Sequence, residues 1–559
     1  MALAVLIHMV VATFSAMGLA LAFGQMNTLI ALTSLAAGAA AGIWTWQKFQ
    51  KDEKLFPNIK IAQGFMYAFV IFVGLQNFLY LLFYNRHGLR TLHLNNFGDL
   101  AMHIQYIRYL AGADFWPENP GFAGTALRYP LGMDLYNALW EAVGVPLDSH
   151  LFVVGLVMTI IAVSMLHRWM GWLGVGAFFL NGGLSNWKVF YYGRLFDFQN
   201  QLAWKSFFLS LWITQRGFLF AIPAGVYIVK MITEALLEER TLNTHEKTVC
   251  AVLWCGLAWF HLHTFFIISL ALGICIVLYK KFRQMLGILL PVAVVGLIFV
   301  LISTNGLAHA KILRIQWGWV AGSERFYTFW VMNLGPWLLL AATTIFFVLK
   351  KQYSQFRVMA IVFFGLFITF TFVIVAPWDW DNIKVLLWLY LLIVWLSWKM
   401  WLSGLRPVFA VLAGCILFIP GSVSLISSLP GNNEGSQLYQ TAELSEAKAA
   451  LLDIDRDAVL VIQPGPNHPA MFWGVKVAEG YPGHMWSHGI DSSERERLIE
   501  KIFRGEDWLV SAKKIGVTHI YWGEHEKAKY GALDPQWQNR LKNVSRSRKI
   551  QVYDIRTYQ

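Results

Sequence analysis

The composition of this 559-residue chain is that of a membrane protein. Hydrophobic residues make up 57% of it and charged residues only 14%, whereas about a quarter of a soluble domain is charged. The formal net charge of +12 does not point to nucleic acid, because Lys and Arg in a membrane protein mostly flank cytoplasmic helix ends and no nucleic-acid motif is present. The four cysteines all lie in apolar runs, so the sequence suggests neither a disulfide framework nor a zinc cluster.

Apolar runs long enough to cross a bilayer recur along the chain. A spanning helix needs about 20 apolar residues, and about thirteen segments meet that rule. They begin near residues 3, 26, 62, 150, 171, 218, 248, 264, 285, 327, 357, 384 and 407. The segments near 248 and 264 have almost no loop between them and could form one bent or re-entrant element. The first segment lacks the basic stretch of a secretory signal, so we interpret it as an uncleaved helix.

Basic residues gather in the short loops on one side of these segments. By the positive-inside rule this side, with the N terminus, is cytoplasmic. The basic residues assigned to it are Lys48, Lys51, Lys54, Lys60, Arg168, Lys280, Lys281, Arg283, Lys350, Lys351, Arg357, Lys399 and Arg406. Because successive spanning segments cross the membrane in opposite directions, we expect the outer face to carry residues 85–149, 186–216, 305–325 and 376–383, together with the chain after about residue 430.

The last part of the chain is polar and alternates helix and strand patterns, as in DAVLVIQ, SERERLIEKIFRG and KIQVYDIR. It lacks a Gly-rich phosphate loop, so a nucleotide site there is not expected. The sequence therefore predicts an α-helical polytopic protein of the plasma (inner) membrane with two domains. Residues 1–429 form the transmembrane domain, whose first outer loop is 85–149, and residues 430–559 form an extracytoplasmic α/β domain.

The first outer loop holds an acid and an imidazole on one predicted helix face. In FGDLAMHIQYIRYL, Asp99 and His103 stand four residues apart, which places both on the same side of a helix. Asp99 fits a general base that serves a substrate at the membrane surface. It equally fits an ordinary helix cap that accepts backbone N–H bonds. For His103, substrate contact and a structural role are both open.

Several cations stand near the predicted outer ends of helices, where a lipid phosphate would lie. Arg216 in TQRGFLF and Lys384 in WDWDNIK each begin an apolar helix, and a charge at that depth is costly and tends to be functional. Arg128 lies in the first outer loop. The simpler interpretation of any one of them is a snorkelling side chain that binds lipid head groups. The other outer cations are Lys188, Arg194, Lys311, Arg314 and Arg325.

The stretch WDWDNIK also carries an acidic pair. Asp379 and Asp381 form a D-x-D pattern, which can hold a divalent cation such as Mg²⁺ or Mn²⁺ through carboxylate oxygens. In the alternative, the two acids pair with Lys384 and nearby arginines. The sequence leaves both alternatives open, and no cofactor is certain. We expect Trp378 and Trp380 to line the path of a donor or an acceptor.

Four further histidines are candidates for substrate contact. His261 and His263 in FHLHTFF lie near the outer end of a spanning segment, where a hydrogen-bonded structural role is the simpler interpretation of His263. His484 and His488 lie in the Pro/Gly-containing tail segment EGYPGHMWSHGID, and loops carry binding more often than strands do. This loop either covers the membrane cavity and touches a sugar or simply docks the tail onto the helices.

In their order along the chain, several of these stretches resemble the GT-C superfamily. The stretches are GDLAMHIQYIRYL, FAGTALRYPLGMD, TQRGFLFAIP, FHLHTFF, WDWDNIK and EGYPGHMWSHGID. GT-C proteins are integral-membrane glycosyltransferases that use polyprenyl-phosphate-linked sugars, and the likeness is greatest to poorly characterised bacterial and archaeal members. Asp99 matches their acidic residue near the start of the first outer loop, which acts as the base on the acceptor. The resemblance also implies inversion at the anomeric carbon.

The sequence departs from two branches of that superfamily. The WWDYG motif of oligosaccharyltransferases is absent, and so is the Asp-Glu pair of protein O-mannosyltransferases, because Leu100 follows Asp99. The acceptor, whether glycan, lipid or protein, is therefore open. We predict a cell-envelope glycosyltransferase that moves a sugar from a polyprenyl-phosphate-linked donor to an acceptor hydroxyl on the outer face. Its expected partners are the lipid-linked donor and membrane lipids, with no nucleic acid. The alternative is a transporter or flippase for a lipid-linked glycan or another anionic amphiphile.

Overall fold

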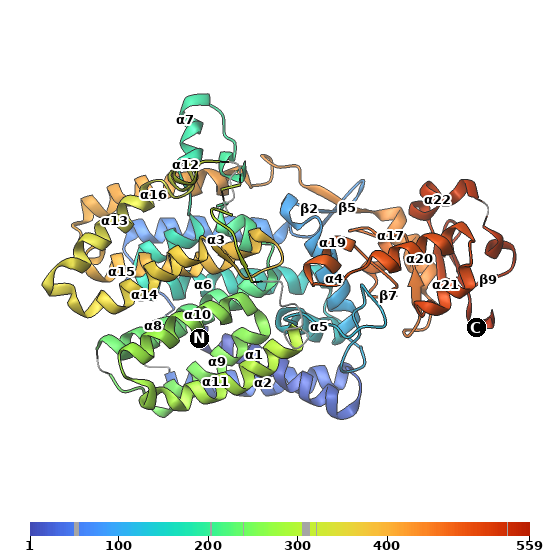
Figure 1. The fold of residues 1–559 in the computed structure, drawn as a ribbon, viewed down its shortest axis with the longest axis horizontal. Helices are drawn as coiled ribbons and strands as arrows, with labels where there is room; N and C mark the ends of the chain where they lie inside the picture. The colour runs from blue at the N-terminus through green and yellow to red at the C-terminus, as the bar shows by residue number, and fades with distance from the viewer. Residues whose placement is uncertain are drawn as a thin grey trace.

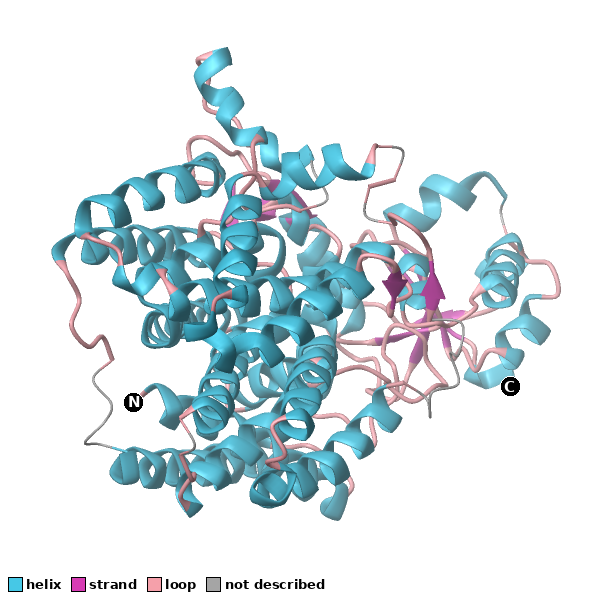
Figure 2. Ribbon diagram, turned by 60° about the vertical axis from the view of Figure 1, so that its left-hand side comes forward, coloured by secondary structure: helices cyan, strands magenta, loops and turns pink. Residues whose placement is uncertain are grey.

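The structure of the chain is a computed structural model. It describes residues 1–49, 55–201, 204–238, 240–304, 313–319, 321–322, 324–533 and 535–558. Three of the basic residues named above, Lys51, Lys54 and Lys311, lie outside the described residues. A helical bundle fills one end of the molecule and a smaller domain with strands fills the other (Figure 1; Figure 2).

Nine helical segments in the described ranges are long and apolar enough to cross a membrane. A tenth is added if the bent pair α12 (Phe326–Leu334) and α13 (Pro336–Leu349) counts as one span. The nine contain α1 (Ala2–Phe23), α2 (Thr28–Phe49), α3 (Ile61–Leu79), α6 (Leu147–Phe179), α8 (Arg216–Leu237), α11 (Phe282–Ser303), α14 (Arg357–Phe370), α15 (Ile383–Met400) and α16 (Pro407–Ser427). The chain is thus a multi-pass membrane protein.

The count is lower than the predicted thirteen because several predicted segments form helices shorter than a full span. The stretch α6 consists of two helices that meet at Met170 and Gly171, whose backbone conformations are not helical, and it corresponds to the two segments predicted near 150 and 171. The segments near 248 and 264 form two helices of 17 residues each, α9 (Thr244–Phe260) and α10 (Leu262–Leu278). His261 alone joins them, in an extended conformation with φ −159°. α12 and α13 meet at 97°.

Burial separates the centre of the bundle from its lipid-facing surface. Nearly every side chain of α8 and α15 is buried, so these two helices form the centre. On α11, by contrast, Leu290, Val294 and Leu297 are more than half exposed. Apolar side chains on the outside are expected where lipid replaces water as the solvent.

Two short amphipathic helices join the bundle to the second domain. α4 (Asp99–Leu110) and α5 (Gly132–Ala142) pack against each other, and in Figure 1 they lie where the bundle meets that domain. Just before α4, the hairpin of β1 (Phe83–Asn85) and β2 (Gly88–Thr91) is extended by β5 (Ser436–Gln440), which pairs antiparallel with β2. A strand from the start of the tail thus completes a sheet begun in the first loop.

The C-terminal region has a mixed sheet with the strand order β7-β6-β8-β10-β9. The strands are β6 (Val459–Val461), β7 (Lys476–Val477), β8 (His519–Trp522), β9 (Lys542–Asn543) and β10 (Gln551–Asp554), and β6 is parallel to β7 and β8. Helices α17 (Thr441–Leu451), α20 (Ser493–Arg504), α21 (Trp508–Lys514) and α22 (Glu524–Tyr530) accompany it. Side chains alternate along a strand, so Val459 and Val461 join one apolar cluster while Leu460 and Ile462 join another. The predicted α/β character of this region is confirmed.

Candidate functional site

Most of the residues selected from the sequence come together at the junction of the two domains. The site is built from the start of α4, the start of α8, the start of α15 and the short helix α19 (Pro482–Ser487) of the C-terminal region. Each of these segments begins or ends at the site. The ends of helices carry unpaired backbone groups, so polar side chains can gather there beside an apolar bundle.

Asp99 is the acid at the centre of this site. Gln215 Nε2 donates a hydrogen bond of 3.2 Å to Asp99 Oδ2, and His484 Nε2 lies 3.6 Å from Asp99 Oδ1. The Asp99 side chain is 40% exposed, so a ligand can reach it. The cap of α4 is Gly98, and no side chain caps this helix end. The interpretation of Asp99 as an ordinary helix cap is therefore wrong.

The surroundings of Asp99 favour its ionised form. Burial by itself raises the pKa of this carboxyl. The contact with His484, whose Nε2 lies 3.6 Å from Oδ1, and the electrostatic effects of His103 and Lys384 act in the opposite direction and hold the pKa of Asp99 below its usual value. Asp99 is thus ionised and partly accessible at neutral pH, as a proton acceptor must be.

His103 is held by an acid that the sequence analysis did not select. Its Nδ1 lies 2.9 and 3.0 Å from the two carboxylate oxygens of Asp134, and both side chains are nearly fully buried. With Nδ1 facing the carboxylate, Nε2 is the ring nitrogen that remains for a further partner. The His103 ring also packs against Tyr129, at 6.0 Å between centroids. Asp134 lies in the first turn of α5, as Asp99 lies in the first turn of α4, a pattern that could have indicated it.

Lys384 connects the acidic pair of the WDWDNIK stretch to Asp99. Its ammonium lies 2.8 Å from Asp381 Oδ1 and donates to Gln215 Oε1 at 3.1 Å, and the side chain is only 8% exposed. Asp379 faces elsewhere and pairs with Arg314 at 2.5 Å. The two acids thus pair with separate cations, as the second interpretation expected. No group of three or more His, Cys, Asp or Glu side chains in the described residues could hold a metal ion, so the divalent cation stays a prediction.

Arg216 is a buried cation with unused donors. It begins α8 and is 2% exposed, and its Nε and Nη2 have no hydrogen-bond partner among the described residues. Asp134 lies within electrostatic range of it. A buried guanidinium with unsatisfied N–H groups is costly, and an anion that enters the site would satisfy them.

The histidines of the α9–α10 junction lie beside the same lysine. His261 Nδ1 bonds to Thr264 at 2.8 Å and caps α10, while its Nε2 is buried without a partner among the described residues. His263 lies within electrostatic range of Lys384 and Asp381. His261 thus has a clear structural role, and His263 is the one of the two that stands nearer the acidic pair.

The C-terminal region closes the site with α19. Burial, together with the charges of His484 and His103, lowers the pKa of His488 to about 4, so His488 is neutral. Its ring packs against Tyr129 at 5.3 Å. At the edge of the site, Trp486 packs edge-on against Trp378 at 5.4 Å, with both side chains about half exposed.

Two predicted residues stand apart from this cluster. Arg128 is exposed and forms no hydrogen bond or ion pair with the described residues, although its neighbour Tyr129 enters the site. Trp380 is half-buried against the bundle core. Gln215, in contrast, was missed by the sequence analysis although it directly precedes Arg216, because an uncharged amide gives no signal of its own.

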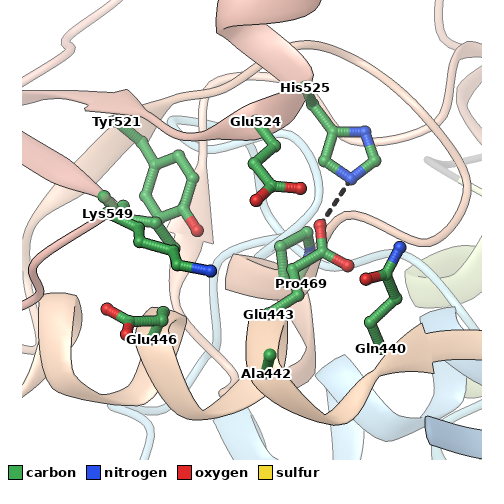
Figure 3. Close-up of a pocket in the computed structure, with 10 residues that line it drawn as sticks. Gln440, Ala442, Glu443, Glu446, Pro469, Tyr521, Glu524, His525 and Lys549 are labelled. Atoms are coloured by element: carbon green, nitrogen blue, oxygen red, sulfur yellow. Dashed lines mark hydrogen bonds and ion pairs between the residues drawn. The ribbon is translucent and has the colours of Figure 1, made fainter. Parts of the chain in front are cut away.

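A second, small pocket lies within the C-terminal region (Figure 3). Its volume is 50 Å³, room for a few water molecules, and its lining includes Glu443, Glu446, Tyr521 and His525. His525 Nε2 bonds to Glu443 at 2.7 Å. Glu446 accepts a hydrogen bond from the hydroxyl of Ser547 at 2.5 Å. Because these acids already have partners, we assign no ligand to this pocket.

Comparison with known proteins finds similarity among solved structures. No protein-family model and no curated protein matches the chain. Among solved structures, the chain is similar to the archaeal oligosaccharyltransferase AglB from Archaeoglobus fulgidus, determined in complex with an inhibitory peptide and a dolichol-phosphate. The sequence identity is 12% and the TM-score 0.41, over 85% of this chain and 71% of that chain. A likeness at this level concerns the arrangement of the fold and assigns no activity to the chain.

Proposed function

We propose that this protein is an inverting glycosyltransferase that uses a polyprenyl-phosphate-linked sugar. The observation that carries the proposal is the position of Asp99. It is an accessible carboxylate with a low pKa at one end of a membrane bundle, in a site that also contains two buried cations, Lys384 and Arg216. A lipid-linked sugar phosphate needs both kinds of group at this depth. The distribution of basic residues among the loops supports an orientation with this end of the bundle and the C-terminal region outside the cytoplasm and the N terminus inside.

The reaction follows from these groups. Asp99 Oδ1 accepts the proton of an acceptor hydroxyl, and the acceptor oxygen attacks the anomeric carbon from the face opposite the phosphate. As that bond forms, the bond from the anomeric carbon to the phosphate oxygen breaks, and its electron pair stays on the polyprenyl phosphate. Arg216 and Lys384 stabilise the charge that develops there. A single displacement inverts the configuration of the sugar.

The donors available to the phosphate can be counted. An ammonium has three N–H groups, and Lys384 gives one to Asp381 and one to Gln215, so one is left. Arg216 offers its unbonded Nε and Nη2, which can bind phosphate oxygens in a fork. Asp379 and Asp381 are engaged with cations of the chain, Arg314 and Lys384.

The remaining predicted residues would line the path of the sugar. His103, His263, His484 and His488 surround the acids with imidazole nitrogens that can bind sugar hydroxyls. Trp378, at the edge of the site, presents a half-exposed aromatic face. The contribution of three predicted residues is tested after that of the central ones. His261 caps α10, and Arg128 and Trp380 stand apart from the cluster around Asp99.

The first experiment compares the wild type with Asp99→Asn in lipid nanodiscs. Each protein is incubated with a panel of polyprenyl-phosphate monosaccharides and an envelope acceptor fraction, and the released polyprenyl phosphate is measured. Loss of the general base should lower release by about 100-fold or more. Asp148→Asn is the matched control, because Asp148 is an exposed acid in the first turn of α6 and should keep wild-type release.

Two results would contradict the proposal. One is release by Asp99→Asn at the wild-type rate. The other is no release by the wild type with any donor while both proteins bind the lipids equally well. In the second case transport of the lipid-linked glycan would become the better explanation.

A further inference from the structure

The amide of Gln215 bonds to two groups of opposite charge. Its Nε2 donates to Asp99 Oδ2 at 3.2 Å, and its Oε1 accepts from Lys384 Nζ at 3.1 Å. An ionised carboxylate can only accept and an ammonium can only donate, so the reversed amide would satisfy neither partner. The chemistry of the two partners therefore fixes the orientation of the amide.

The backbone and the partner residues hold this amide in place. The Gln215 N–H bonds to Leu211 O at 2.9 Å, and its carbonyl accepts from the Phe218 N–H at 2.9 Å. Gln215 is the residue that precedes α8, in an extended conformation. On the far side Asp381 holds Lys384 at 2.8 Å. The side chains of Asp381, Lys384, Gln215 and Asp99 thus form one continuous series of polar contacts, from the residues just before α15 to the start of α4.

We propose that Gln215 is the positioning residue of the base. It holds Asp99 Oδ2 so that Oδ1 is the oxygen that faces the acceptor, and it makes the orientation of Asp99 depend on the Lys384–Asp381 pair. This inference rests on the proposed role of Asp99 in glycosyl transfer.

A neutral amide between Asp99 and Lys384 leaves Asp99 a stronger base than direct contact with the lysine would. A direct ion pair between Lys384 and Asp99 would be a stronger, charge-assisted bond and would make the carboxylate a weaker base. The amide keeps the ammonium one side chain away, where a free N–H can still reach a phosphate. The other titratable groups near Asp99 are His103 on α4, Tyr129 before α5, His484 on α19 and His488 at its end.

The test is the pH dependence of polyprenyl phosphate release in two variants of Gln215. Gln215→Met keeps the size of the side chain but removes its donor. Gln215→Glu places a second carboxylate beside Asp99 and gives Lys384 a new partner. We expect the apparent pKa of the low-pH limb to increase from wild type to Gln215→Met to Gln215→Glu. At pH values below this apparent pKa, we expect the kcat of Gln215→Met to be about tenfold lower than that of the wild type, with KM nearly unchanged.

The matched control is Gln105→Met. Gln105 is a buried glutamine on α4 whose Nε2 donates to the carbonyls of Pro120 and Val475, so the same substitution removes a buried amide without touching Asp99. Its pH limb should coincide with that of the wild type. Two results would overturn the inference. One is an apparent pKa of the low-pH limb in Gln215→Met that equals that of the wild type, and the other is the same shift of this pKa in Gln105→Met.

A second measurement does not depend on turnover. In a Cys415→Ser background the other three cysteines are buried, so Asp99→Cys provides a single accessible thiol. The pH dependence of its reaction with N-ethylmaleimide gives the thiol pKa. Adding Gln215→Met should raise that pKa, because the thiolate loses a donor. If the wild type releases no polyprenyl phosphate, the transferase proposal fails, while this titration still decides whether Gln215 acts on position 99; an unchanged thiol pKa would refute it.

Discussion

Glu479 is a buried carboxyl whose ionisation should loosen the part of the C-terminal region that closes the site. It lies between β7 and α19, its exposed fraction is 0%, and neither carboxylate oxygen has a hydrogen-bond partner among the described residues. Ser492 is close, but its hydroxyl donates to Glu496. Burial, with the charge of Glu496, raises the pKa of Glu479 from 4.5 to about 7 against the smaller opposing effects of Ser492 and Arg495.

The sign and size of the effect follow from linkage. The folded pKa is the higher one, so Glu479 contributes stability below pH 4.5 that is lost as the pH rises through about 7. One pKa unit corresponds to about 1.4 kcal/mol, so the loss is about 1 kcal/mol at pH 5 and about 3 kcal/mol at pH 8. Glu479→Gln is neutral at every pH and avoids this loss. Its advantage over the wild type should therefore grow by about 2.5 kcal/mol between these pH values.

Hydrogen exchange of residues 478–490 measures this difference locally. The ratio of protection, Glu479→Gln over wild type at the same pH, should rise about 70-fold from pH 5 to pH 8. Glu506→Gln is the control, because Glu506 is exposed in the same region and its substitution should leave the ratio flat. A ratio for Glu479→Gln that does not change with pH would refute the argument, since it would mean that the carboxyl is ionised in the folded protein without cost.

Three further predictions concern the site itself. His484→Gln removes a group that lowers the pKa of Asp99, so the low-pH limb of polyprenyl phosphate release should move to higher pH in a rate profile. Lys384→Met should weaken binding of sugar-free polyprenyl phosphate about tenfold, measured in nanodiscs, and equal binding would exclude the lysine as a phosphate ligand. Trp486→Ala should weaken binding of the sugar-bearing lipid more than that of the bare lipid phosphate, because an aromatic face contacts a sugar ring. Trp317→Ala, at an exposed tryptophan outside the cluster, should weaken neither, and equal effects of the two alanine variants would contradict a sugar contact.

Much of the architecture follows from the order of residues. Runs of apolar side chains must leave water, and only helices satisfy their backbone within lipid, so the bundle could be predicted. Short continuous apolar runs such as that of β6 predicted the α/β character of the C-terminal region, because a strand with both faces covered buries every side chain. The position of Asp99 also follows, since an acid that comes just after a hydrophobic run must lie near the membrane surface.

The places where helices break could be predicted approximately from the lengths of the apolar runs. Met170 and Gly171 separate two helices where the segments predicted near 150 and 171 meet. In the same way one residue, His261, separates α9 from α10, where the segments predicted near 248 and 264 meet. Tertiary packing decides between a kink and a break, because neighbouring helices must satisfy the backbone groups that either one frees.

The partners of the charged residues were decided by the tertiary structure alone. Asp99 meets Gln215 across 116 positions of sequence and His103 meets Asp134 across 31. Arg314 reaches Asp379, and so divides the acidic pair, because β3 (Arg314–Ile315) pairs with β4 (Val373–Ile374). A sequence fixes which charges exist and how deep they lie, but a hydrogen bond forms only over about 3 Å. Which acid is held by a cation, and which faces the substrate, is set by how the helices pack.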